Sequence, residues 1–102
     1  MSEDIWSEDE LVIVLDAYLN EGANAYERDN KVEELHKIMN RSKGSIALRI
    51  ANFKHLNPLD NAEGMENGGE HCESVWKNYR DSKHELKEAA QSIKEDLGKD
   101  ED

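Results

Sequence analysis

The alternation of apolar and polar positions predicts helices along most of the chain. In the first segment apolar residues recur at helical spacing: Leu11, Val14, Leu15, Tyr18 and Leu19. Ser7, with Glu10 three residues later, has the pattern of a capping box, so we expect a helix over 8–20. Trp6 and Leu11 have the spacing of a hydrophobic staple. The run LVIVL also suits a short β-strand, but the capping residues and the longer period favour a helix.

Two further helices follow an expected loop at 21–30. Asn30 is the expected N-cap of the second helix, whose inward positions are Val32, Leu35, His36 and Met39. Residues 40–42 form a short break, and Ser42 is the expected N-cap of a third helix that ends near Phe53 or His55. The apolar face of this third helix comprises Ile46, Ile50 and Phe53. Asn57–Pro58 stops it, because a residue before proline avoids the helical conformation.

The remaining chain divides into a loop and two more helices. The three glycines of segment 59–69 favour a loop. We expect a fourth helix over 71–79, and a fifth that Ser82 caps and Gly98 stops. The expected fold class is therefore all-α, with a three-helix core followed by two further helices. Residues 1–80 form the expected core domain, and 81–102 a C-terminal helix with an acidic tail.

Charge distinguishes the middle of the chain from its ends. The net charge is −11 over 102 residues, yet residues 31–54 carry six Lys/Arg against two Glu, a net of +4. Acidity of this size lowers non-specific affinity for DNA and anionic membranes. The basic segment coincides with the second and third expected helices, which makes nucleic-acid contact the first hypothesis.

Two helices joined by about three polar residues match a helix-turn-helix of the Myb or homeodomain kind. The N-terminal part of the second of them would then enter the major groove. Arg pairs with guanine, Asn pairs with adenine, and hydroxyl groups bind phosphate. Ser42, Ser45, Arg49 and Asn52 are three or four residues apart, so we expect them to form one polar stripe on the face of the third helix opposite its apolar residues, with Arg41 and Lys43 in the turn. The expected DNA-binding residues are therefore Arg41, Ser42, Lys43, Ser45, Arg49 and Asn52. An ordinary solvated helix face would carry similar residues, so both interpretations stay open.

An ordered series of residues carries a family resemblance. It comprises Trp6-Ser7-x-x-Glu10-Leu11, Leu15-x-x-Tyr18, Val32-x-Glu34-Leu35, Asn40-Arg41-Ser42-x-Gly44-Ser45-Ile46-x-x-Arg49-Ile50-x-Asn52-Phe53, Leu56-Asn57-Pro58, Gly64-Met65-x-x-Gly68-Gly69 and Val75-Trp76. It resembles the N-terminal helical domain of prokaryotic HNH endonuclease-like restriction proteins of the McrA type, over roughly 6–80. The resemblance implies a DNA-contact or targeting module, in a prokaryote or a phage. It does not extend to the nuclease, whose His and Asn motif in a ββα unit has no counterpart here.

Other chemistry is weakly represented. His36, His55, His71, Cys72 and His84 are scattered and lack the spacing of a zinc site, so we expect no metal, and no cofactor motif occurs. No nucleophile–base set is visible, so we expect no enzyme and no catalytic residue. One cysteine and no membrane-spanning apolar run suggest a cytoplasmic protein without a membrane partner.

The first functional hypothesis is thus a small non-catalytic module that binds DNA modestly and salt-sensitively through the third helix. The alternative is an acidic protein-interaction module, or an inhibitor of the antidefence or DNA-mimic type. Such a protein would bind a basic partner, for instance a nuclease or another nucleic-acid-binding protein. The acidic clusters at 3–10 and 95–102 motivate this alternative.

Overall fold

Helices are the only regular structure within residues 6–57 and 70–99, the part of the chain that the computed structural model describes. They are α1 (Glu8–Glu21), α2 (Asn30–Met39), α3 (Lys43–Leu56), α4 (Glu70–Tyr79) and α5 (Lys83–Lys99). The predicted all-α class is confirmed. The predicted loop at 59–69 and the tail beyond Lys99 lie outside the described residues.

Helix α1 begins at the predicted capping box. The Ser7 hydroxyl accepts from the Glu10 backbone N–H at 3.2 Å, and the Glu10 carboxylate accepts from the Ser7 N–H at 3.0 Å. These two bonds satisfy two of the donors that a helix start leaves unpaired. Gly22 ends the helix with φ of 72°, a left-handed conformation that glycine adopts without steric cost.

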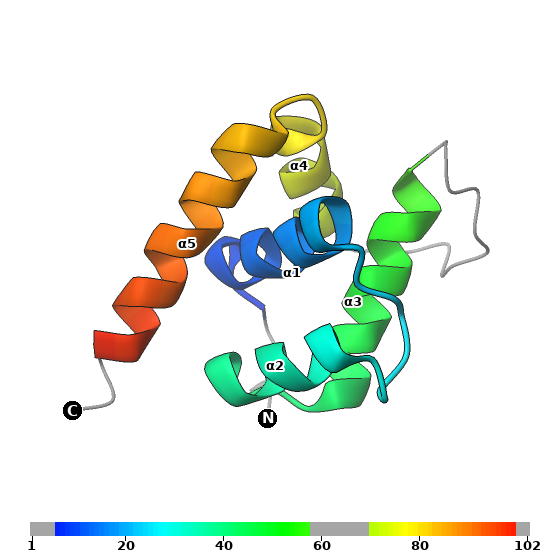
Figure 1. Cartoon of the computed structure of the whole chain (residues 1–102). Helices are drawn as coiled ribbons and strands as arrows, with labels where there is room; N and C mark the ends of the chain where they lie inside the picture. Colours follow the sequence, from blue (N-terminus) through cyan, green and yellow to red (C-terminus); the bar gives the residue numbers. More distant parts are fainter. Residues whose placement is uncertain (1–5, 58–69, 100–102) are drawn as a thin grey trace.

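Helix α1 is the central element of the fold, with the other four helices around it (Figure 1). Every residue from Leu11 to Tyr18 is buried, so the buried surface extends far beyond the predicted stripe. A helix that is apolar on all sides belongs in a core. This position explains why LVIVL reads like a buried strand although it forms a helix.

The structure corrects the predicted start of α2. Asp29, and not Asn30, is the N-cap: its carboxylate accepts from the Lys31 N–H at 2.8 Å, while Asn30 is already helical. Asp29 also accepts from the Asn24 backbone at 3.1 Å, which orders the preceding loop. Both residue types cap helices well, so the sequence alone could not separate the two neighbours.

Helix α3 has the predicted N-cap, and its end is tied to α1. The Ser42 hydroxyl accepts from the Ser45 N–H at 3.1 Å. At the other end, the C-cap residue Asn57 donates through its side-chain amide to the Tyr18 hydroxyl at 2.9 Å. Helix α1 packs against both α2 and α3, so the three predicted core helices do contact one another, while their description as a helix-turn-helix stays a prediction.

Helices α4 and α5 complete the same core. Cys72, Val75 and Trp76 from α4 are buried together with Leu86 and Ala90 from α5. The helix α5 continues through Gly98 to Lys99, so the predicted stop at Gly98 is wrong. A single glycine near a helix end lowers stability by at most about 1 kcal/mol, which the packing of the preceding turns readily offsets.

One carboxylate lies inside the contact between α1 and α5. Asp16 is buried and accepts from the Asn20 amide at 2.7 Å, while Asn20 also donates to the Lys83 carbonyl at 3.1 Å. Burial raises the pKa of Asp16, and the hydrogen bond from Asn20 only partly opposes this. Asp16 therefore prefers its protonated form more in the folded protein than in the unfolded chain.

Candidate nucleic-acid interface

The turn between α2 and α3 is short and well bonded. It consists of Asn40, Arg41 and Ser42, and Asn40 ends α2 in the left-handed conformation with φ of 57°. His36 Nδ1 contacts the Arg41 carbonyl. Because a carbonyl oxygen only accepts, Nδ1 carries the proton and donates. The turn thus holds the start of α3 in a fixed relation to α2.

The Arg41 side chain leaves this turn and binds the start of α1. Its Nε and Nη2 atoms donate to the two carboxylate oxygens of Glu10, each at 2.8 Å. The side chains of the pair are only 18% and 19% exposed. Burial raises the pKa of Glu10, but the hydrogen bonds from Arg41 and from the Ser7 backbone outweigh burial and hold it below its usual value. Glu10 is therefore anionic at neutral pH.

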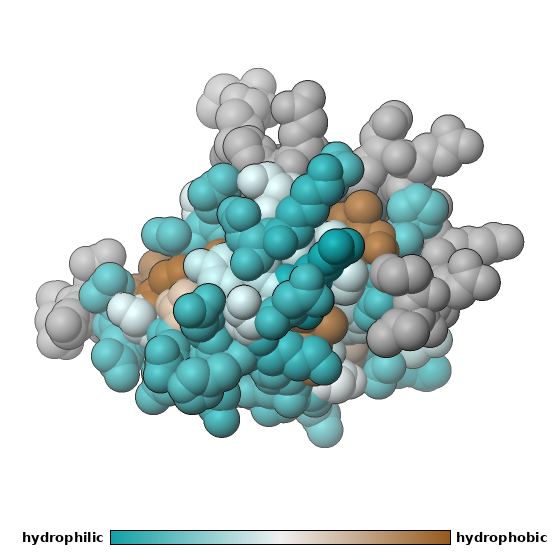
Figure 2. Space-filling model, turned by 90° about the horizontal axis from the view of Figure 1, so that it is seen from above, coloured by the Kyte–Doolittle hydropathy of each residue, from teal (hydrophilic) through white to brown (hydrophobic). Residues whose placement is uncertain are grey.

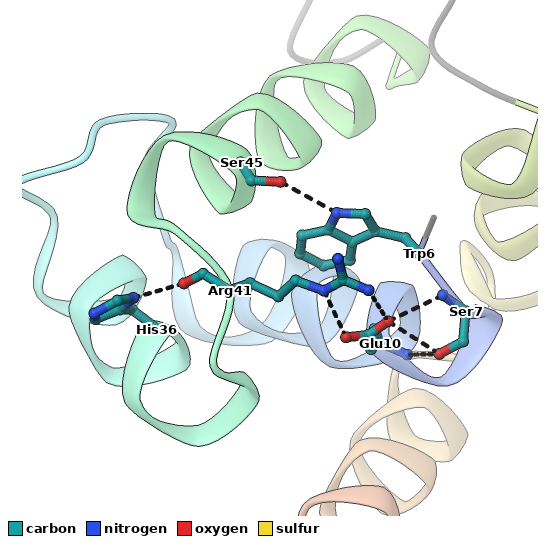
Figure 3. Close-up of polar contacts among 6 residues, drawn as sticks. All are labelled: Trp6, Ser7, Glu10, His36, Arg41 and Ser45. Carbon is teal, nitrogen blue, oxygen red and sulfur yellow. Dashed lines mark hydrogen bonds and ion pairs between the residues drawn. The ribbon is translucent and has the colours of Figure 1, made fainter. Parts of the chain in front are cut away.

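Trp6 links this ion pair to α3, as Figure 3 shows. Its indole N–H donates to the Ser45 hydroxyl at 3.1 Å. Its ring centroid lies 4.9 Å from the Arg41 guanidinium carbon and 5.0 Å from that of Arg49. Both distances are within the range of cation–π contacts. Ser45 and Arg49 are spaced by four, so they lie along one flank of α3, and Trp6 lies against that flank.

The structure therefore gives the predicted DNA-binding residues different positions. Arg41, Ser45 and Arg49 gather around Trp6 instead of forming an outward row. Ser42 is exposed, with its hydroxyl bonded at the start of α3. Lys43 is half-buried and lies in the first turn of α3. Their contact with DNA stays a prediction.

Asn52 is not on the surface, so its predicted place in an exposed polar stripe is wrong. Only 4% of the residue is exposed, and its Oδ1 atom has no hydrogen-bond partner within the described part of the chain. Cys72 of α4 lies close by. Burial raises the pKa of the Cys72 thiol, against the opposing effects of the Arg49 charge and of a hydrogen bond from Asn52. The interior position excludes Asn52 from reading a base while α4 stays packed on α3.

The geometry of a helix explains this correction. Ser45, Arg49 and Asn52 each directly precede a buried residue of the apolar face, and one residue rotates the helix by only about 100°. They lie beside that face and not opposite it. Residues that precede the apolar face by two positions, about 200° away, point outward. These are Gly44, Leu48 and Ala51, of which Leu48 is 38% exposed.

We define the outer face of α3 as its outward residues Gly44, Leu48, Ala51 and His55, together with the half-buried Lys43 and Lys54, which lie at the two ends of the helix and about 100° around it from them. The sequence prediction missed Leu48, Ala51, Lys54 and His55, because the polar stripe that it took as the outward face lies beside the apolar face. A rotation of the predicted stripe by about 100° on the helical wheel would have found Leu48, Ala51 and His55.

Helix α3 itself contributes no carboxylate to its outer face. Among the five described helices, only α3 contains neither Asp nor Glu. Lys43 and Lys54 form no ion pair within the described residues. The Glu27 carboxylate lies beside the first turn of α3: a Cβ atom at position 44 would lie 3.4 Å from Glu27 Oε2.

Other kinds of site are not formed by the described residues. Within 6–57 and 70–99, no three His, Cys, Asp or Glu side chains gather closely enough to hold a metal ion. No described helix has the length and apolarity needed to cross a bilayer. The face seen from above in Figure 2 is mainly hydrophilic, and its hydrophobic areas are small and separate. That face offers no broad apolar surface.

Comparison with known proteins gives no match. No protein-family model, no curated protein and no solved structure is similar to this chain. The resemblance to the N-terminal domain of McrA-type restriction proteins therefore stays a prediction that rests on the quoted residues alone.

Proposed function

We propose that this protein is a non-catalytic DNA-binding module that presents the outer face of α3 to the duplex. The observation that carries the proposal is the absence of any carboxylate from α3 in a chain of net charge −11. A phosphate backbone is repelled by acidic surfaces, so the most favourable place for it is beside the one described helix that lacks them.

The outer face of α3 offers two kinds of contact. Lys43 and Lys54 lie eleven residues apart, about three helical turns, and so return to the same side of α3, where they could bind phosphates on either side of a groove. Leu48 and Ala51 lie on the outward side and could contact thymine methyl groups. Long-range repulsion from the acidic remainder keeps the affinity modest and strongly dependent on salt.

The test compares two charge-matched variants. We would measure binding to a labelled DNA duplex by fluorescence anisotropy between about 20 and 150 mM salt. The variant K43Q/K54Q removes both lysines of the outer face. The control K37Q/K77Q removes two exposed lysines of α2 and α4 that pair with Glu33 and Glu73. Both variants lower the net charge by the same amount.

The proposal expects K43Q/K54Q alone to reduce the magnitude of the salt slope by about 2, one for each lost phosphate contact. Equal slopes for the two variants would show that the outer face makes no phosphate contact. Wild-type protein that fails to bind at the lowest salt would overturn the proposal altogether.

A specific observation favours binding to a basic protein as the second candidate. Tyr26 and Leu48 are the exposed large hydrophobic residues among those described, at 60% and 38%. Glu27, which follows Tyr26 in the loop before α2, lies close to Gly44, one turn before Leu48 in α3. Under this candidate, duplex DNA does not bind at low salt, a Lys- and Arg-rich peptide does bind, and L48S weakens that binding. An McrA-like partnership with a separate nuclease would be one form of it.

A further inference from the structure

Two arginines share one indole at the flank of α3, but their environments differ. The Arg41 guanidinium has its Nε and Nη2 atoms bound to Glu10. The Arg49 guanidinium stacks on the same ring and has no carboxylate partner within the described residues. Among the described residues, the guanidinium groups of Arg41 and Arg49 and the carboxylate of Glu10 thus lie around one indole, and Figure 3 shows Arg41, Glu10 and Trp6.

Stacking on Trp6 leaves the edge of the Arg49 guanidinium available. A planar guanidinium that contacts a ring through its face still presents N–H donors along its rim. Carboxylate and phosphate both bind this rim through two parallel hydrogen bonds. Glu10 therefore occupies, on Arg41, the kind of position that a phosphate oxygen pair would take.

From this geometry we propose that Arg41, Arg49 and Trp6 form a phosphate-binding site beside the outer face of α3, with Glu10 as a competing internal ligand. The inference rests on the proposed function. It gives the reason why the affinity for DNA is limited, since Glu10 competes with phosphate for Arg41. Phosphate first meets Arg49, whose rim is not taken by Glu10. Arg41 contributes only when it exchanges Glu10 for the phosphate.

The location favours a DNA phosphate over a protein carboxylate. Ser45 and Arg49 lie along one flank of α3, and the turn that carries Arg41 directly precedes Lys43 of the outer face. In helix-turn-helix proteins, backbone phosphates lie along the turn and the helix flanks while bases meet the helix. A duplex on the outer face would bring a row of phosphates to this flank, whereas a protein carboxylate would supply one isolated charge.

Glu10→Gln tests the competition, and Glu8→Gln is its matched control. Both substitutions remove one negative charge from the first turn of α1, but Glu8 is exposed and only Glu10 binds Arg41. Glutamine can still complete the capping box, so α1 keeps its start. We expect E10Q to raise DNA affinity about three- to fivefold more than E8Q, which is the range of a released ion pair. Its salt slope should become steeper by about 1.

A double-mutant cycle identifies Arg41 as the source of the gain. Arg41→Gln should change DNA affinity little in the wild-type background, and should abolish the gain in the E10Q background. If E10Q proves too unstable to measure, E10D retains the charge and shortens the side chain, so a gain at unchanged net charge carries the same meaning. Urea unfolding of each variant confirms that folded proteins are compared.

The outcomes separate the two proposals. Equal affinities for E10Q and E8Q, while wild-type protein binds DNA and K43Q/K54Q weakens binding, would overturn the competition and leave the DNA-binding function intact. A gain in E10Q that survives R41Q would also overturn it. No binding by any variant at low salt would overturn the proposed function itself. Binding of a Glu-rich peptide instead of DNA to E10Q would assign the site to a protein carboxylate.

Discussion

Arg41 donates two hydrogen bonds of 2.8 Å to Glu10, across 31 residues of sequence, and joins the turn before α3 to the first turn of α1. The contact is partly buried, bidentate and supported by the Trp6 ring. It fixes the position of α3 relative to the start of α1.

Arg41→Lys should therefore destabilise the fold even though it retains the charge. Lysine cannot form the planar bidentate contact, and it stacks less well on an indole. We expect a loss of about 1–2 kcal/mol in the free energy of unfolding, measured by urea denaturation at pH 7. The control K37A breaks an exposed pair with Glu33 and should cost at most about 0.5 kcal/mol. Similar losses for both variants would contradict a structural role for the Arg41 pair.

Two glycines should respond to alanine with opposite signs. Gly22 has φ of 72°, where a Cβ atom is strained, so Gly22→Ala should lower the stability by about 1 kcal/mol. Gly44 lies in the first turn of α3, where an added Cβ atom would lie 3.4 Å from Glu27 Oε2, an ordinary contact distance. Gly44→Ala should therefore raise the stability by about 0.5–1 kcal/mol through helix propensity. Thermal or urea unfolding checks both. A stability loss in G44A would mean that Glu27 packs more tightly against α3 than the structure shows.

Asp16 and Glu10 should make stability respond to pH in opposite directions. The folded pKa of Asp16 is raised, so its contribution to stability is present at low pH and is lost as the pH rises from 3.8 through the folded pKa. The folded pKa of Glu10 is lowered, so its contribution is present above 4.5 and is lost as the pH falls through the folded pKa.

Asp16→Asn isolates the first of these effects. The difference in unfolding free energy between wild type and D16N should shift in favour of D16N as the pH rises above 3.8. Urea denaturation at several pH values between about 3 and 7 measures this difference. A difference that stays constant across that range would contradict the burial of a charged carboxylate between α1 and α5.

Asn52→Leu tests the interior position of Asn52. Leucine has a similar volume and removes the Oδ1 atom that lacks a partner in the described residues. We expect the free energy of unfolding to rise by about 1 kcal/mol, since an unpaired buried acceptor costs about 1–3 kcal/mol and a weak bond to Cys72 is lost. DNA affinity should stay within about twofold of wild type. A loss of about 1–3 kcal/mol in DNA affinity would restore the base-reading role that the sequence suggested.

Local chemistry made the helices predictable, whereas the site depended on long-range contacts. Ser7, Glu10 and Ser42 predict helix starts from the residues next to them in the sequence, and the structure has helices that begin there. The burial of Asn52 depends on α4, which begins at Glu70 and brings Cys72 against it. No periodicity within α3 could reveal a neighbour so distant in the sequence.

The contacts of Arg41 and Arg49 could not be predicted for the same reason, because their partners are distant in the sequence. In the sequence both arginines look like free cations, because Glu10, which binds Arg41, lies 31 residues earlier and Trp6, which contacts Arg49, lies even farther from it in the N-terminal segment. The staple pattern of Trp6 and Leu11 correctly indicated that both residues are buried. It did not indicate that the indole also contacts two guanidinium groups, one from α3 and one from the turn before it.

The most direct test of the central claim is to map the backbone amide signals of the protein by NMR while a DNA duplex is added at about 20 mM salt. We predict that the shifted signals gather on Lys43–Leu56 and on the turn before it, and that they return as salt is raised to about 150 mM. Shifts concentrated on α4 and α5, or no salt-sensitive shifts at all, would contradict the claim that the outer face of α3 binds DNA.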